Sequence, residues 1–206
     1  MRLARQSERG DTIIEVLFAV TVFAMVAVGS LSIMNQGTGS AQRSLEVTLV
    51  RAQIDAQAEA IRFIHQAYVT SYQKNVEPVG IAAGWTDIVT NHKKDVPSAY
   101  GALTADNKCP DAVPPNAFIV NARIATVSGV TPTMRPPEGS SLPPFAQVAY
   151  NGDILDQAYG MWVEAVPSAA TDGPDFVDFH IRACWDSPGA AIPVTLGTIV
   201  RLYEPN

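Results

Sequence analysis

The sequence predicts an α+β protein, in which one long N-terminal helix precedes a C-terminal region of strands and loops. Two observations carry this prediction. All 15 prolines lie at Pro78 or later, and proline interrupts helices but suits turns and loops. Beyond Pro78, short segments alternate apolar and polar residues, which is the period of a half-buried strand. We therefore predict helix over residues 11–77 and a β-rich head over residues 78–206, which is enough chain for one domain with a core.

The composition indicates a folded, acidic protein without a nucleic-acid partner. Hydrophobic residues make up 47% of the chain and charged residues 17%, which is ordinary for a globular protein. Asp and Glu number 20 against 14 Lys and Arg. The adjacent basic pair Lys93-Lys94 is followed at once by Asp95. An acidic body without basic clusters argues against generic binding to phosphates.

The first elements are a short basic leader, residues 1–10, and a long apolar run. The run from Thr12 to Met34 has 23 residues, one charge (Glu15) and no proline. As a helix it is about 35 Å long, enough to cross a hydrocarbon core of about 30 Å. Its apolar residues surround the helix, unlike the single stripe of a core helix, and it exceeds the roughly 7–15 apolar residues of a signal peptide.

We therefore predict a membrane-spanning helix over residues 11–36. Leader arginines Arg2, Arg5 and Arg9 favour a cytoplasmic N-terminus and an extracytoplasmic head. Glu15 is the informative residue, because a carboxylate at the bilayer centre costs on the order of 2–3 kcal/mol and normally has a partner or a function. The alternative is that Glu15 lies near enough to the membrane edge to reach the headgroups.

The residues around the leader's end point to a family. Arg9-Gly10 followed by Asp-Thr-Ile-Ile-Glu, Asp11 to Glu15, resembles the prepilin peptidase site of type IV pilins and type II secretion pseudopilins. In that family a basic leader ends in glycine, and the mature chain continues with Thr, aliphatic residues and a glutamate at its fifth position. The departure is Asp11, where phenylalanine or methionine is usual, so methylation of the new amine stays open. The resemblance covers about the first 60 residues.

The resemblance implies an assembly subunit that is not an enzyme and has no cofactor. A prepilin peptidase would cleave between Gly10 and Asp11, and Glu15 would pair with the freed α-amine of a neighbouring subunit's Asp11. The subunit, major or minor, would polymerise with other pilin subunits into a type IV pilus or a secretion pseudopilus. Its other partners would be the membrane and an assembly platform protein with a separate ATPase. The alternatives are a DNA-uptake pseudopilin and a single-pass, membrane-anchored surface binding protein or adhesin that does not polymerise.

The helix is expected to continue beyond the membrane as an amphipathic half, residues 37–77. Glycines at Gly29, Gly37 and Gly39 predict a kink or local melting, because each mid-helix glycine costs about 1 kcal/mol. Farther on, apolar residues recur three or four apart and predict the stripe that packs on a sheet: Leu45, Leu49, Ala52, Ala56, Ala60, Phe63, Ile64 and Ala67. A coiled coil is the alternative for this stripe.

In the head, alternation predicts four strands: Phe118–Thr126, Gly160–Val166, Val177–Trp185 and Leu196–Tyr203. The third is clearest, with Val177, Phe179 and Ile181 on an apolar face. Turns are expected at residues 172–174 and 186–189. Residues 78–115 are predicted to be loops with short elements, including a turn around Gly80 to Gly84, and residues 131–144 an exposed loop.

Cys109 and Cys184 are the cysteines of the chain, and without CxxC spacing they make a poor metal site. In an exported head they are expected to form a disulfide, with two free thiols as the alternative; many members of the resembled family also have one in this region.

Two further hypotheses, a catalytic cluster and a calcium site in the head, have less support from the sequence. Asp178, His180 and Arg182 share a strand face, but without a nucleophile motif we expect a solvated sheet face. The acidic run of Asp172, Asp175 and Asp178 does not match an EF-hand loop, so we predict no metal site.

Overall fold

The computed structural model of the chain describes residues 13–95, 97–98, 108–137, 139, 143, 145–168 and 175–205. The chain divides into two units, residues 1–42 and 43–206. Helix α1 (Ile13–Gln73) is 61 residues long and contributes to both units.

The first unit, where the structure describes it, is the apolar part of α1. The backbone stays helical through Gly29, Gly37 and Gly39, so the predicted local melting was wrong. The large apolar side chains from Ile13 to Met34 are all exposed. Among the described residues, α1 is one helix long and apolar enough to cross a membrane.

The second unit begins with the remainder of α1, which packs on the head through a different stripe from the predicted one. The buried residues on this face are Glu46, Val50, Ile54, Gln57, Ala58, Ala60, Ile61 and Ile64. Of the predicted stripe, Ala60 and Ile64 are buried, whereas Leu45, Leu49 and Phe63 are exposed. The predicted stripe is therefore mostly the outer face of the helix.

After Pro78, where loops with short elements are predicted, the chain forms a short helical segment, and this segment takes the place of the turn predicted around Gly80 to Gly84. The 3₁₀ helix η1 (Gly80–Ala82) leads directly into α2 (Ala83–Asn91). Gly80 begins the segment with φ +60°, a left-handed conformation that glycine adopts without strain. Trp85 and Ile88 of α2 are buried in the core, and this burial stabilises a helix that is short on its own.

Two hairpins follow. The first pairs β1 (Val120–Asn121) with β2 (Thr126–Val127), so the single strand predicted over Phe118–Thr126 was wrong. The Asn121 side chain accepts the Arg123 N–H at 3.0 Å, which starts a turn within that segment. The second pairs β3 (Gln147–Asn151) with β4 (Ile154–Tyr159) across the two residues Gly152 and Asp153.

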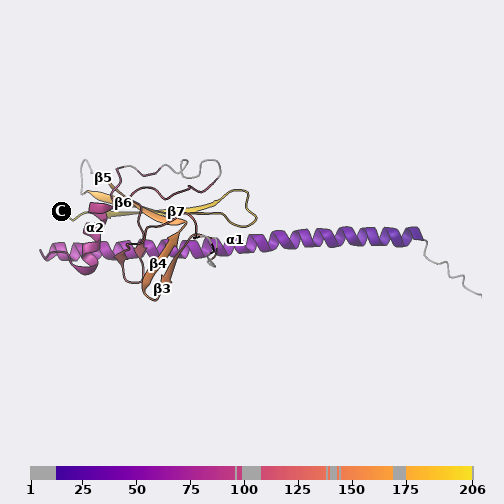
Figure 1. The fold of residues 1–206 in the computed structure, drawn as a ribbon, viewed down its shortest axis with the longest axis horizontal. Coiled ribbons are helices and arrows are strands. Elements are labelled where there is room, and N and C mark those ends of the chain that lie inside the picture. The colour runs from indigo at the N-terminus through magenta and orange to yellow at the C-terminus, as the bar shows by residue number, and fades with distance from the viewer. Residues whose placement is uncertain are drawn as a thin grey trace, which may run out of the picture. The chain divides into compact units, whose positions relative to one another are not determined.

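The largest sheet has three antiparallel strands in the order β5-β6-β7 (Figure 1). They are β5 (Met161–Ser168), β6 (Phe176–Trp185) and β7 (Val194–Tyr203). These strands confirm three of the four predicted segments. The coarse prediction of an α+β protein, with a long N-terminal helix and antiparallel sheets, is also confirmed.

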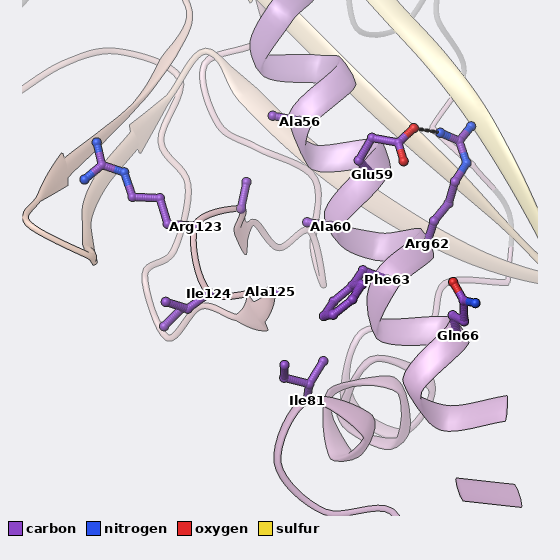
Figure 2. Close-up of a pocket in the computed structure, with 11 residues that line it drawn as sticks. Ala56, Glu59, Ala60, Arg62, Phe63, Gln66, Ile81, Arg123, Ile124 and Ala125 are labelled. Carbon is purple, nitrogen blue, oxygen red and sulfur yellow. Dashed lines mark hydrogen bonds and ion pairs between the residues drawn. The ribbon is translucent and has the colours of Figure 1, made fainter. Parts of the chain in front are cut away.

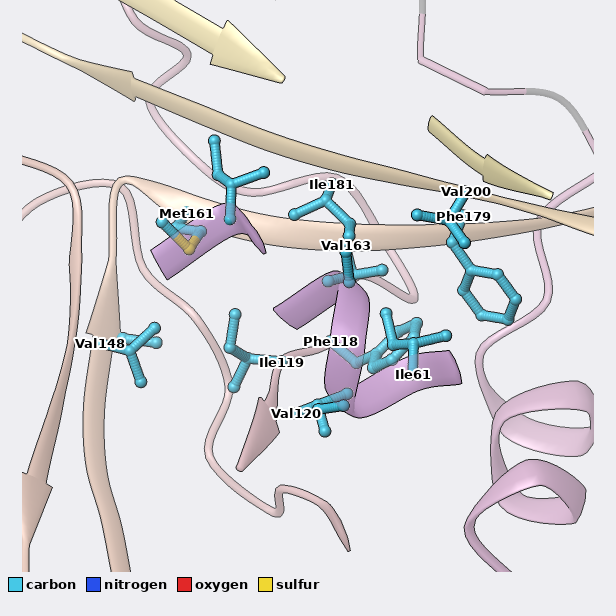
Figure 3. Close-up of a cluster of buried hydrophobic side chains, with 14 of the residues drawn as sticks. Ile61, Phe118, Ile119, Val120, Val148, Met161, Val163, Phe179, Ile181 and Val200 are labelled. Carbon is cyan, nitrogen blue, oxygen red and sulfur yellow. The ribbon is translucent and has the colours of Figure 1, made fainter. Parts of the chain in front are cut away.

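The core of the head lies between α1 and this sheet. Figure 3 shows Ile61 of α1 beside Phe118, with Val163 of β5 and Phe179 and Ile181 of β6 around them. All five side chains are at most 1% exposed. The alternation predicted for β6 therefore selects the correct inner face.

Candidate functional site

Glu15, the predicted assembly residue, lies in the first turn of α1. It is exposed, and its neighbours Ile14 and Val16 are exposed as well. No hydrogen bond or ion pair joins Glu15 to another residue in the described part of the chain. A carboxylate here is favourable for the helix itself, because it lies near the positive end of the helix dipole. The predicted processing residues Gly10 and Asp11 lie outside the described residues.

The cysteines of the head are bonded. Cys109 and Cys184 form a disulfide with Cα atoms 5.7 Å apart, which confirms the predicted pair. Cys184 lies near the end of β6, and the bridge ties the segment around Cys109 to the central strand of the sheet. Trp162 and Met134 pack beside it in a small second cluster.

A buried carboxylate on α1 connects the helix to the end of β6 and to the turn after it. Glu46 is 3% exposed. Its Oε2 accepts hydrogen bonds from Trp185 Nε1 at 3.1 Å and from Ser187 Oγ at 2.6 Å. The apolar stripe predicted from the sequence does not include Glu46, whose hydrogen-bond partners lie about 140 residues away in the chain.

A second buried carboxylate, Glu164 on β5, holds a charged cluster together. Its Oε1 accepts hydrogen bonds from Lys94 Nζ at 2.9 Å and from Ser98 Oγ at 2.7 Å. Arg182 Nη1 lies 3.5 Å from Oε2 and also donates to the Ser98 carbonyl at 2.6 Å. Burial raises the pKa of Glu164, but hydrogen bonds from Ser98 and Lys94 and the charges of Lys94 and Arg182 outweigh it, so the pKa lies below its usual value.

The polar face of β6, which carries Asp178, His180 and Arg182, is predicted to be solvated, but part of it belongs to this cluster. Arg182 is buried, so the predicted solvated face was wrong at this residue. Asp178 accepts two hydrogen bonds of 2.8 Å from Arg201 of β7, and this pairing lowers its pKa. Burial lowers the pKa of His180, and the charge of Arg182 adds to the effect. Asp178 thus joins β6 to β7, and Arg182 joins β6 to β5 and to the loop at Ser98.

The head also carries a groove of about 690 Å³ beside the outer face of α1. Its floor includes Ala56 and Ala60, and Phe63 points into it between Ile81 of η1 and Ile124 of the first hairpin (Figure 2). Glu59 and Arg62 are also among its lining residues and form an ion pair with each other, on the side of α1 away from Phe63 in Figure 2. The sequence does not predict this groove, because the residues that form its far side, Ala122 to Ala125, lie about 60 residues from Phe63 along the chain.

Within the part of the chain that the structure describes, no group of three or more His, Cys, Asp or Glu side chains is arranged to hold a metal ion. Asp172 of the acidic run lies outside that part, and Asp178 is bonded to Arg201. Comparison with known proteins finds no family model, no curated protein and no solved structure that matches the chain.

Proposed function

We propose that this chain is a structural subunit, major or minor, of a type IV pilus or a type II secretion-type pseudopilus. It is processed by a prepilin peptidase between Gly10 and Asp11 and polymerises through its N-terminal helix. Its head lies outside the membrane, and the assembly platform and ATPase are separate proteins.

The observation that carries the proposal is the composition and exposure of α1. From Val16 to Gln42 the helix has no charged residue, and its large apolar side chains are exposed in the single chain. Such a surface needs lipid or other apolar helices around it. Glu15 stands at its start without a described partner, and a cation that meets it in lipid stabilises it strongly. The freed α-amine of a neighbouring Asp11 is such a cation, and it exists only after cleavage.

Two measurements test the proposal. N-terminal sequencing of the membrane-extracted protein should start at Asp11, whereas a plain membrane anchor would retain residues 1–10. Glu15→Ala should leave membrane insertion intact and reduce incorporation into filaments, with Glu15→Asp as the conservative control. An intact leader, or normal incorporation of Glu15→Ala, would contradict the proposal.

A further inference from the structure

A pocket of about 340 Å³ lies where α1 ends in the head. Tyr68 and Tyr72, one helical turn apart, line it from α1, and Thr86 lines it from α2. Just beyond α1, Asn75 has the left-handed backbone conformation, with φ +50°, that often closes a helix. The chain turns there, so that Glu77 lines the pocket as well. We call this site the tyrosine pocket.

The tyrosine pocket combines aromatic rings with polar groups that are available to a ligand. The Tyr68 ring is stacked on the ring of Trp85, which is 1% exposed, with the two ring centroids 6.0 Å apart. Tyr72 is 48% exposed. Neither tyrosine hydroxyl, nor the Glu77 carboxylate, forms a hydrogen bond or an ion pair with another residue that the structure describes. Aromatic side chains with a few polar groups are typical of a binding pocket.

These side chains select the chemistry of the ligand. Grooves lined by aromatic rings bind extended proline-rich segments, whose conformation is largely fixed before they bind. Tyrosine rings also attract cations, and so does the carboxylate of Glu77. The ligand that fits both features is an extended segment with prolines and a positive charge.

The chain itself has such a segment, Arg135-Pro136-Pro137. We call these three residues the proline segment. Arg135 and Pro137 are exposed. Proline fixes its own φ at about −65° and disfavours the helical conformation of the residue before it, so the segment favours an extended conformation. The Arg135 guanidinium has no hydrogen bond or ion pair with the rest of the described chain, and its positive charge matches the negative charge of Glu77.

The proline segment lies at the other end of the head from the tyrosine pocket. Arg135 and Pro136 line a second cavity, of about 360 Å³, together with Trp185. Trp185 in turn donates a hydrogen bond to Glu46, near the start of the head part of α1. Tyr68 lies 22 residues farther along the helix, which is about 33 Å. The proline segment therefore does not reach the tyrosine pocket of its own head.

We propose that the tyrosine pocket binds the proline segment of a second copy of this chain, with Arg135 of that copy beside Glu77. The inference rests on the proposed function, because it is assembly that brings a second copy there. All copies enter the membrane in one direction, so a displacement along α1 by about the length of the head brings the proline segment of one copy to the tyrosine pocket of another. The two surfaces differ, so the contact is head-to-tail and leaves a free surface of each kind for further copies.

The rings and the charges have separate roles in this contact. The prolines pack on the tyrosine rings and bury apolar surface, and they lose little conformational freedom because their backbone is already restricted. The pair of Arg135 and Glu77 fixes the direction in which the segment lies in the pocket, because ion pairs at the edge of an interface give orientation and specificity more than affinity.

Site-specific photo-crosslinking tests the proposal in the full chain, expressed with its own processing and assembly proteins. A photoreactive phenylalanine analogue replaces Tyr72, and in the control it replaces Thr70, which is exposed on the opposite side of the helix. The adduct from position 72 should have the mass of two chains, and mass spectrometry should locate it within residues 131–137 of the second chain, with few such adducts from position 70. Adducts with other segments, with another protein or with lipid alone, or no adduct, would overturn the proposal.

An exchange of the two charges supplies the second arm. Glu77→Arg and Arg135→Glu should each lower the yield of the adduct from position 72 about fivefold, and the two changes together should restore it. Asp55→Arg, an equal change of charge at an exposed position of the same helix, should leave the yield unchanged. Single variants with the wild-type yield, or a double variant without restoration, would overturn the proposed pairing.

Two measurements on the same samples complete the test. Tryptophan fluorescence and an intact disulfide check that every variant folds. N-terminal sequencing separates the two proposals: cleavage after Gly10 with adducts elsewhere refutes the tyrosine pocket alone, and an uncleaved chain refutes the proposed function.

Discussion

The side chain of Gln57 forms two hydrogen bonds with the backbone of Val120, as the backbone of a neighbouring strand would. Its Nε2 donates to the Val120 carbonyl at 2.6 Å, and its Oε1 accepts the Val120 N–H at 2.8 Å. Gln57 is 1% exposed and Val120 is fully buried. One turn earlier, Gln53 Oε1 accepts the Val148 N–H at 2.7 Å. Because buried backbone groups need partners, these glutamines let α1 pack against segments of β1 and β3.

Gln57→Leu should therefore destabilise the head by about 2–4 kcal/mol, since each of two buried backbone groups loses its partner at about 1–3 kcal/mol. The measurement is urea unfolding of the detergent-solubilised chain, followed by the fluorescence of Trp85, Trp162 and Trp185, all buried in the head. The control is Gln66→Leu at an exposed position of the same helix. Equal losses in the two variants would contradict the assigned role.

The Cys109–Cys184 bond closes a long loop, with 75 residues of sequence separation. Replacing both cysteines by alanine should lower the free energy of unfolding by about 4 kcal/mol, because the unfolded chain regains the freedom that the loop removes. Reductant should destabilise the wild type and leave the double variant unchanged. A variant as stable as the oxidised wild type would show that the bond does not stabilise the head.

Glu164 should make the head sensitive to acid. Its folded-state pKa is lowered, so its contribution to stability is present above its unfolded pKa of about 4.5 and is lost as the pH falls through the lower folded value. At pH 7, Glu164→Gln should cost about 3 kcal/mol, because Lys94 and Arg182 lose their buried counter-charge.

The control is Glu59→Gln, at an exposed ion pair of α1, which should cost less than about 1 kcal/mol. Denaturant unfolding from pH 7 down to acid should show the difference between wild type and Glu164→Gln shrinking as the pH falls. A constant difference would mean that the carboxylate charge is not the source of the stability.

The parts of the fold that could be predicted are those in which the sequence of one segment is enough to indicate its secondary structure and its buried face. The alternation of Val177, Phe179 and Ile181 identifies the inner face of β6 without knowledge of its neighbours. Likewise, the apolar run before Met34 predicts a long helix from its composition alone.

The packing face of α1 could not be predicted in that way, because two of its buried residues are polar. Trp185 and Ser187 supply hydrogen bonds to Glu46 from distant segments, and Val120 does the same for Gln57, which favours the burial of both side chains. The spacing of apolar residues alone therefore predicts the wrong packing face of α1, the one that is exposed. The hairpin of β3 and β4 did have a local signal, the pair Asn151-Gly152 between strand-like segments.

His180 gives the head a further pH dependence near neutrality. Asp178 and Glu164 favour its charged form, but burial and the charge of Arg182, whose Nη2 lies 3.5 Å from His180 Nδ1, outweigh them and lower its pKa. The unfolded chain, with a histidine pKa of about 6.5, then binds a proton more readily than the folded one. Stability is full above pH 6.5 and declines as the pH falls from 6.5 to the folded pKa. NMR titration of the His180 ring should give a pKa below 6.5, and His180→Gln should flatten the stability profile over that interval. A ring pKa at or above 6.5, or an unchanged profile in the variant, would show that burial does not control this histidine.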